Sequence, residues 1–295
     1  MLVIMIVAQL MGVLAKLVLF EVEAFRFVWL QVFAASLFMA VYTFAFRREG
    51  WPKGLSPKEW GAVALVGVVN FGIVRFCMLL SLERLPATTH VFLMSFVSLA
   101  TMAMSVAFLA ERPSRLQVLG ALVAIAGVRL FFPDLPPPRE MLGVAYVSVV
   151  VLGLGLANNV TRWLVTRASD RLSSSQLTAI SMLVGGVPLV ATGLVLDPSL
   201  DVGGLRNGLI ILANGVIGIA LVQTVLNAIF RTLRSYEVSI LAGSGVIWTA
   251  LLAVPILGER LLGQQVFAIG IVMTGLFLAQ LRKGDLARGP ALAAE

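Results

Sequence analysis

Two segments carry the clearest evidence for the fold of this chain, residues 85–112, LPATTHVFLMSFVSLATMAMSVAFLAER, and residues 233–260, LRSYEVSILAGSGVIWTALLAVPILGER. Each segment is a long apolar run that ends in a Glu-Arg pair, and a shift of 148 positions superimposes the two pairs. The pairs are Glu111-Arg112 and Glu259-Arg260, and with the same shift Leu85, Leu93, Thr101, Gln117, Val118 and Gly127 meet Leu233, Leu241, Thr249, Gln265, Val266 and Gly275. A charged pair and a glycine in one register are difficult to attribute to chance, so we infer an internal duplication.

The composition requires lipid as the solvent of most of the chain. Of 295 residues, 59% are hydrophobic and only 13% are charged, and the mean hydropathy is +0.99. These values lie well outside the usual range of soluble globular domains. The apolar runs match the ~20 residues that a helix needs to cross the hydrocarbon core, and the short alternating segments of a membrane β-barrel are absent from the sequence. The fold class is therefore predicted to be an all-α integral membrane protein.

Ten membrane-spanning helices are predicted from the apolar runs between charged or Pro/Gly-rich breaks. The first run starts at Met1 without a basic leader or a cleavage site, so we expect a retained helix rather than a signal peptide. The predicted spans are 1–20, 24–46, 59–82, 86–110, 115–132, 140–166, 173–196, 206–230, 235–257 and 262–281.

A proline-rich segment divides these spans into two sets of five. Residues 133–139, which include Pro136-Pro137-Pro138, cannot continue a helix and are predicted to be a linker. The first five-helix repeat is then 1–132, the second is 140–282, and 283–295 form a tail. An odd number of spans in each repeat inserts the two repeats in opposite orientations. Such inverted repeats are typical of secondary transporters, whose substrate site lies near the bilayer midplane between the repeats.

The distribution of basic residues predicts that both termini are cytoplasmic, in the inner (plasma) membrane of the cell. With this orientation, fourteen Lys and Arg residues lie near the inner side and six near the outer side. The inner set is Arg47, Arg48, Lys53, Lys58, Arg112, Arg115, Arg162, Arg167, Arg171, Arg231, Arg234, Arg282, Lys283 and Arg288, and the outer set is Arg26, Arg84, Arg129, Arg139, Arg206 and Arg260.

Several partners are excluded at this stage. The single cysteine, Cys77, cannot form an intramolecular disulfide or a cysteine-based metal cluster. The net charge of +7 comes from Lys and Arg residues in short loops, where they set orientation, so a nucleic-acid partner is not expected. We expect no cofactor and no metal. The expected partners are the lipid bilayer and a small-molecule substrate, and the expected state is a monomer or weak homo-oligomer.

Polar residues inside the spans are candidates for a substrate site, because an ionisable side chain in hydrocarbon costs at least ~2.5–3.5 kcal/mol and therefore faces a cavity or a partner. Arg75 lies within the third span, with Asn70 five residues earlier, and the repeat places Gln223 at the equivalent position. In a polar cavity, Arg75 would attract a carboxylate or phosphate. The alternatives are a structural ion pair with Glu21, Glu23 or Glu83, and snorkelling toward the outer interface.

Amide and indole side chains on the later spans complete the predicted site. Such groups orient amino, carboxyl or hydroxyl groups and stack against apolar substrates, or they serve as interhelical hydrogen bonds and interfacial anchors. The candidates are Asn158, Asn159 and Trp163 on the sixth span, Asn214 with Gln223 and Asn227 on the eighth, and Ser244 with Trp248 on the ninth. Gly243-Ser244-Gly245 is the best candidate for a hinge.

His90 is the only histidine and lies near the start of the fourth span. It is a candidate proton carrier for coupled export, because histidine titrates near physiological pH, although a lone histidine on an apolar helix more often serves packing. The middle of each predicted span contains no carboxylate, so an acidic proton relay is not visible. A membrane-embedded enzyme is disfavoured for the same reason, since it would need an assembled set of catalytic groups. A passive channel would need a filter motif, and none is visible.

Four short motifs make the chain resemble the EamA-type branch of the drug/metabolite transporter superfamily, which has ten helices in two duplicated five-helix units. They are Phe25-Arg26-Phe27, Leu82-Glu83-Arg84-Leu85-Pro86-Ala87, Leu109-Ala110-Glu111-Arg112 and Leu257-Gly258-Glu259-Arg260-Leu261. The resemblance covers nearly the whole chain. It implies alternating-access export of amino acids or similar metabolites, with amphiphilic drugs as the alternative substrates.

Two positions depart from the pattern of that family. Ala8 stands where many members have a tryptophan in the first span, although Lys16 resembles the basic residue often found near the end of that helix. The proline expected early in the ninth span is missing, and Pro255 comes much later. The resemblance therefore predicts the fold and the class of transporter more firmly than the substrate.

Overall fold

The computed structural model describes residues 2–109, 114–132, 137–232 and 245–280, and every regular element in these ranges is helical. Three of the elements are π-helices that continue or interrupt an α-helix. The elements are α1 (Leu2–Val18), α2 (Ala24–Ala40), η1 (Val41–Phe46), α3 (Pro57–Val66), η2 (Gly67–Val74), α4 (Arg75–Arg84), α5 (Ala87–Met94), α6 (Val97–Leu109), α7 (Arg115–Phe131), α8 (Pro138–Arg167), α9 (Ser174–Leu196), α10 (Leu205–Ala213), η3 (Asn214–Leu221), α11 (Val222–Thr232), α13 (Gly245–Leu257) and α14 (Gly263–Gln280).

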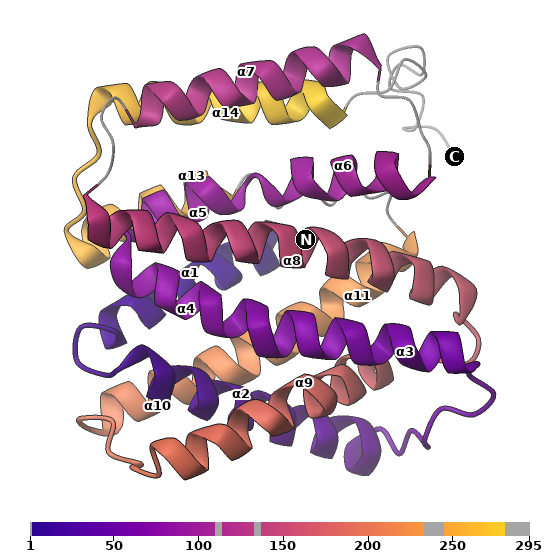
Figure 1. Cartoon of the computed structure of the whole chain (residues 1–295). Coiled ribbons are helices and arrows are strands. Elements are labelled where there is room, and N and C mark those ends of the chain that lie inside the picture. Colours follow the sequence, from indigo (N-terminus) through magenta and orange to yellow (C-terminus); the bar gives the residue numbers. More distant parts are fainter. Residues whose placement is uncertain (1, 110–113, 133–136, 233–244, 281–295) are drawn as a thin grey trace.

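These helices reproduce the spans predicted from the sequence. Each span that the structure covers at both ends begins and ends within two residues of its prediction, while the start of the ninth falls among residues 233–244, outside the described ranges. Six helices are long and apolar enough to cross a membrane, and α1, α13 and α14 are shorter apolar helices. The helices run side by side, and most of their connections gather at two opposite edges of the view (Figure 1).

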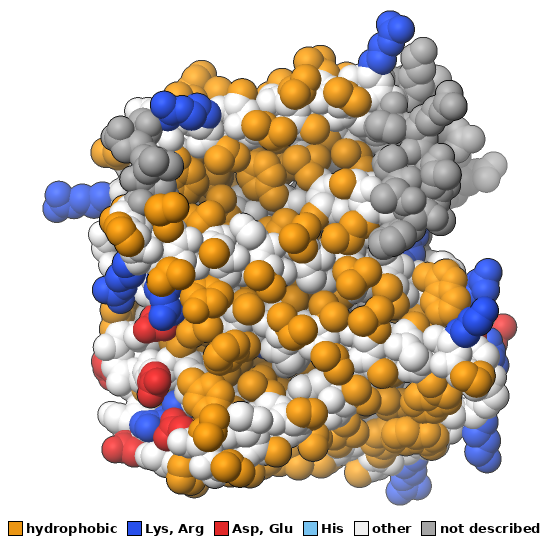
Figure 2. All heavy atoms as spheres, in the orientation of Figure 1, with side chains coloured by type: hydrophobic (Ala, Val, Ile, Leu, Met, Phe, Trp, Pro, Cys, Tyr) orange, Lys and Arg blue, Asp and Glu red, His pale blue; other side chains and the backbone are white. Residues whose placement is uncertain are grey.

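The surface has the polarity expected of a membrane protein. On the face drawn in Figure 2, hydrophobic side chains cover the middle, whereas Lys, Arg, Asp and Glu lie toward the two edges where the helices end. Large apolar side chains such as Leu122, Ile125 and Leu152 are more than half exposed. A broad apolar belt between two charged rims is the surface that a lipid bilayer solvates.

Glutamine side chains explain one of the identities between the repeats. The side-chain oxygen of Gln117 accepts the backbone N–H of Ser114 at 2.8 Å, and that of Gln265 accepts the backbone N–H of Leu262 at 3.1 Å. Both bonds satisfy a donor at the start of a helix, which otherwise lacks an intrahelical partner. The same glutamine in each repeat thus starts α7 and α14.

Small residues line the most extensive helix contact, which joins α7 to α14. A Cβ atom added to Gly127 would lie 2.4 Å from Val272, and one added to Gly275 would lie 2.4 Å from the backbone nitrogen of Ala124. Ala124 and Val272 are related by the same 148-position shift as the two glycines. The contact of Gly127 with Val272 and that of Gly275 with Ala124 are therefore equivalent under the repeat. In both, the small size of glycine lets the two helix backbones approach each other.

Candidate functional site

The third helix of each repeat contains a π-helix at its centre. In the first repeat η2 separates α3 from α4, and in the second η3 separates α10 from α11, with starting residues 147 positions apart. A π-turn is wider than an α-turn, and such turns often occur at functional sites. η2 ends immediately before Arg75, and η3 ends two residues before Gln223. Nothing in the sequence pattern predicted these π-helices, because their composition is that of any apolar helix.

Glycines place these π-helices against the other repeat. Gly67 at the start of η2 lies against α9, where an added Cβ would meet the backbone oxygen of Ser181 at 2.6 Å. Gly215 in η3 lies against α2, where an added Cβ atom would meet the backbone oxygen of Gln31 at 2.4 Å. The pseudo-symmetric crossing holds both π-helices between the repeats, where the sequence predicts the substrate site.

Arg75 is the charged side chain of this region, and its guanidinium is incompletely paired. Its Nε atom is buried and finds no hydrogen-bond partner in the described parts of the chain, and Nη1 reaches only the sulfur of Met78 at 3.8 Å. The side-chain oxygen of Asn70, in η2, is also buried and unpartnered. Buried polar groups are nearly always satisfied, so two open groups five residues apart require an explanation.

The predicted ion-pair alternative for Arg75 is not what the structure shows. Glu83 pairs with Arg84 at 3.0 Å, and Glu21 accepts a hydrogen bond from Asn207 at 2.7 Å. Glu23 precedes α2 and makes no hydrogen bond to Arg75 within the described residues. Among the described residues, the Arg75 guanidinium therefore has no carboxylate partner.

Two amide-threonine contacts link the first helix of each repeat to the fourth helix of the other. The hydroxyl of Thr249 on α13 donates to the side-chain oxygen of Gln9 on α1 at 2.8 Å. The Asn159 side chain on α8 donates to the backbone oxygen of Thr101 on α6 at 3.0 Å. Gln9 was not predicted from the sequence. The one signal was the identity of Thr101 and Thr249 between the repeats, because each of these threonines takes part in one of the two contacts.

Other predicted site residues already bind within the protein. Asn214 donates to the backbone oxygen of Met11 at 2.7 Å, and Gln223 donates to Asn227 at 3.2 Å. These contacts match the interhelical alternative, since Met11 belongs to α1. Among the described residues, Arg75 and Gln223 share no hydrogen bond despite their equivalent positions.

The tryptophans and Asn158 occupy different environments. Trp163 is 36% exposed, and the Arg167 guanidinium lies 5.3 Å from its ring centroid, as in an interfacial anchor. Trp248 on α13 is half-buried, and its Nε1 atom has no partner in the covered ranges. Asn158 is half-buried on α8. Ser244 and the predicted hinge at residues 243–245 lie outside the described residues, apart from Gly245.

His90 is fully enclosed near the start of α5. Its Nδ1 atom lies 3.0 Å from the Ser81 hydroxyl on α4, and its Nε2 atom has no partner within the part of the chain that the structure covers. A hydrogen bond on one ring nitrogen fixes the ring orientation, as in a packing histidine.

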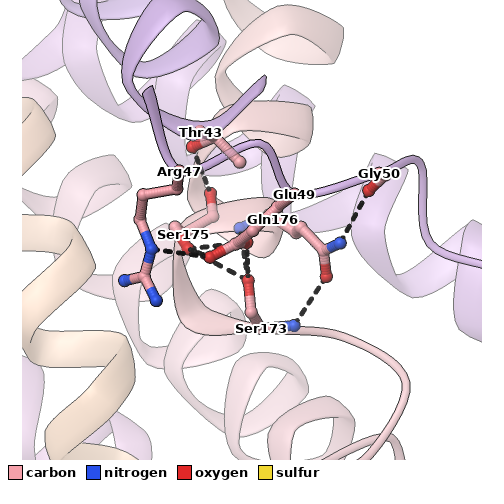
Figure 3. A network of polar contacts seen from close by, with 7 residues as sticks. All are labelled: Thr43, Arg47, Glu49, Gly50, Ser173, Ser175 and Gln176. Carbon is pink, nitrogen blue, oxygen red and sulfur yellow. Dashed lines mark hydrogen bonds and ion pairs between the residues drawn. The ribbon is translucent and has the colours of Figure 1, made fainter. Parts of the chain in front are cut away.

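The antiparallel pair α2 and α9 is tied at both ends by polar contacts between the repeats. At one end, the Arg26 guanidinium donates to both oxygens of Asp197, each at 2.8 Å. At the other end, the Glu49 carboxylate accepts hydrogen bonds from Ser173 and Ser175 at the start of α9, and Arg47 pairs with it at 2.9 Å (Figure 3). Because each tie joins one repeat to the other, this pair is fixed at both faces.

Asp197→Asn is expected to lower thermal stability slightly at neutral pH. The hydrogen bond from Arg26 lowers the pKa of Asp197 from its ordinary value of 3.8, so the tie stabilises the fold above that value and is lost as the pH falls through the lowered pKa. Ion pairs at a solvated surface contribute little, and for this partly exposed pair we expect a fall in Tm of no more than about 3 °C. Melting curves of both proteins at neutral and strongly acidic pH test this, and a difference that persists in acid would contradict it.

The fold has relatives among known proteins. The family model described as "EamA-like transporter family" matches residues 1–132 and 141–281. A solved crystal structure is similar over 94% of both chains, with a TM-score of 0.67 and 15% identity. Among curated proteins, no sequence matches this chain.

The family match agrees with the helices described above. Two family units in one chain confirm the all-α membrane fold with two inverted five-helix repeats, and they make the protein a multi-pass membrane transporter of the drug/metabolite type. The solved structure supports the fold alone, because its identity is low. Both units of the match fall on the repeats, and the chain belongs to the EamA-like transporter family.

Proposed function

We propose that this protein is a secondary transporter that exports small carboxylate-bearing metabolites, amino acids or related compounds, across the inner membrane by alternating access. The substrate binds between the two repeats, near the π-helices η2 and η3, and the two repeats rearrange to expose it to each side in turn. Both termini, and the face that carries Glu49, are cytoplasmic. The face that carries Glu259 is then the outer face.

One observation supports this proposal most directly, namely the incompletely paired guanidinium of Arg75. A buried charge without a counter-charge is costly, and described carboxylates that could have compensated it, Glu21 and Glu83, bind elsewhere. A carboxylate is the natural ligand of a guanidinium, because two parallel hydrogen bonds match their geometries. A bound carboxylate would offset the cost of burying this charge.

Asn70 and Trp248 each carry an open polar atom that suits the remainder of an amino-acid-like substrate. The open side-chain oxygen of Asn70 can accept a hydrogen bond from an amino group, and the indole of Trp248 offers an apolar surface with a free N–H donor. Asn159, Asn214 and Gln223 are instead engaged with neighbouring helices, so we assign them to holding the walls of the site.

Counterflow in liposomes tests the proposal. Purified protein is screened for thermal stabilisation by a panel of amino acids, other carboxylates and neutral amphiphiles, and the stabilising compounds are then tested as labelled substrates in proteoliposomes and in empty liposomes. We expect saturable uptake of a carboxylate that speeds up when the unlabelled compound is present inside. Flux that is linear with concentration would indicate a pore, and chemical conversion without flux would indicate an enzyme.

A further inference from the structure

At the junction between α4 and α5, charged side chains of other helices and loops bind the backbone groups that lack intrahelical partners. α4 ends at Arg84 and α5 begins at Ala87. The Lys16 ammonium on α1 donates to the backbone oxygens of Leu82 at 2.5 Å, Glu83 at 3.2 Å and Leu85 at 2.9 Å. Carbonyls at a helix C-terminus lack intrahelical partners and attract a cation, so Lys16 anchors this end of α4 within the first repeat.

Glu259 satisfies the other side of the junction, and it comes from the second repeat. Its carboxylate accepts the backbone N–H of Ala87 at 2.5 Å, the backbone N–H of Thr88 at 3.1 Å and the hydroxyl of Thr88 at 2.6 Å. The first donors of a helix attract an anion, and a carboxylate that accepts several of them forms strong, charge-assisted bonds. This carboxylate therefore joins the two repeats at this face, where Arg26–Asp197 and Asn207–Glu21 also join them.

A turn at a glycine brings the Glu259 side chain to the start of α5. Gly258 follows the end of α13 with φ +68°, a left-handed conformation that other residues rarely adopt. α13 packs against both α5 and α1, so the carboxylate lies where central helices of the two repeats meet. Its counterpart by the repeat shift, Glu111, lies outside the described residues.

The Glu259 contact differs from the ties of α2 and α9. That pair is bound at both faces, by Arg26 with Asp197 and by Glu49 with Ser173 and Ser175, and so cannot open one face without breaking a tie. The side chain of Glu259 is only half-buried, so water can solvate the carboxylate once it leaves α5. Because water replaces the hydrogen bonds that the carboxylate loses, breaking this contact costs only moderate free energy.

We propose that Glu259 is the latch of the outer entrance. Bound to the start of α5, its carboxylate holds α13 of the second repeat against the first repeat, and its release lets α13 move away from α5 at the outer entrance. The inference rests on the proposed alternating-access function. It assigns to Glu259 a conformational role, and it assigns no contact with substrate.

Thiol labelling of a buried reporter beside the junction tests the latch. In a Cys77→Ser background, Ser81→Cys places a thiol at a position that is 0% exposed, on the last turns of α4. The reporter protein is purified, placed in lipid nanodiscs and treated with a charged maleimide. Adding Glu259→Gln is expected to raise the labelling rate about tenfold, because the weakened latch shifts the population toward the open face.

A matched variant and a milder variant complete the test. Glu83→Gln removes a carboxylate from the same face that pairs only with Arg84, within α4, and is expected to leave the rate unchanged. Thr88→Val removes one donor and keeps the backbone bonds, and is expected to raise the rate about threefold. The proposal is overturned if Glu259→Gln and Thr88→Val are labelled at the same rate as the reporter protein alone. It is also overturned if Glu83→Gln raises the rate as much as Glu259→Gln does.

Folding and transport are monitored separately. If Glu259→Gln does not elute as a folded protein, Thr88→Val decides the outcome, because it changes a single methyl-for-hydroxyl group. Labelling requires no substrate, so a latch that fails leaves the counterflow result standing. Conversely, faster labelling of Glu259→Gln in a protein that shows no counterflow would support the latch as a contact and reject the transport function.

Discussion

Arg75→Ala is expected to remove counterflow of carboxylate substrates without destabilising the protein. A hydrogen bond to a charged group contributes about 1.5–3 kcal/mol, which corresponds to roughly a 10- to 100-fold fall in flux at subsaturating substrate. The described structure gives Arg75 no carboxylate partner, so its removal breaks no ion pair and relieves the cost of an unpaired buried charge. We therefore expect a Tm equal to or above that of the wild type in the absence of substrate.

Two comparisons make the Arg75 experiment specific. Arg75→Lys retains the charge but loses the planar fork, and is expected to have intermediate flux. A neutral substrate, if the panel yields one, should lose less flux than a carboxylate in Arg75→Ala. Unchanged carboxylate flux would remove Arg75 from the site, and a sharp fall in Tm would instead indicate a structural role.

Gly185→Ala is expected to prevent formation of the native fold. A Cβ atom at position 185 in α9 would lie 1.9 Å from the backbone oxygen of Gly67 in η2. The obstructing atom is backbone and cannot rotate away, so the two helices would have to separate along their contact. Overpacked cores that can adjust lose about 1–3 kcal/mol, and a clash with backbone exceeds the range that adjustment can absorb. We expect little or no monodisperse protein by size-exclusion chromatography.

Gly61→Ala is the matched control for this change. Gly61 lies on α3, in the same span as Gly67, and an added Cβ would meet nothing within 4 Å. Alanine is the better helix former by about 1 kcal/mol, so this variant should be as stable as the wild type or more stable. A Gly185→Ala protein that elutes and melts like the wild type would show that α9 and η2 do not pack as described.

The arrangement of spans and repeats could be predicted from the sequence because lipid imposes a strong pattern on it. Runs of apolar residues must be helical and must be about as long as the bilayer is thick. The pair Glu111-Arg112 and Glu259-Arg260 fixed the register of the duplication, and the Gly127 and Gly275 contacts with α14 and α7 follow the same register.

The details of the site could not be predicted in the same way. The π-helices η2 and η3 depend on tertiary packing against α9 and α2, which a local sequence window does not contain. Polar residues were found, but whether each one is satisfied depends on its neighbours. Asn214 has a backbone acceptor on α1, while Asn70 has an open oxygen, and both look alike in sequence.

The charged residues at the helix ends show the same limit. Lys16 and Glu259 were recognised as family-like positions, yet their partners are backbone groups at the junction of α4 and α5, and backbone groups have no signature in sequence. A loop residue that binds a helix end some 170 positions away becomes visible only when the chain is folded.

The double tie of α2 and α9 also constrains how the chain is made. The partners of Arg26 and Glu49 are Asp197 and Ser173, which emerge from the ribosome long after them. Until then, α2 lies in the bilayer with both polar ends hydrated and without α9, whose Gly186 and Gly193 pack against Trp29, Val32 and Ser36. We therefore expect the first repeat to be an assembly intermediate rather than an independent domain. Separately expressed halves should become functional only after they meet within the membrane.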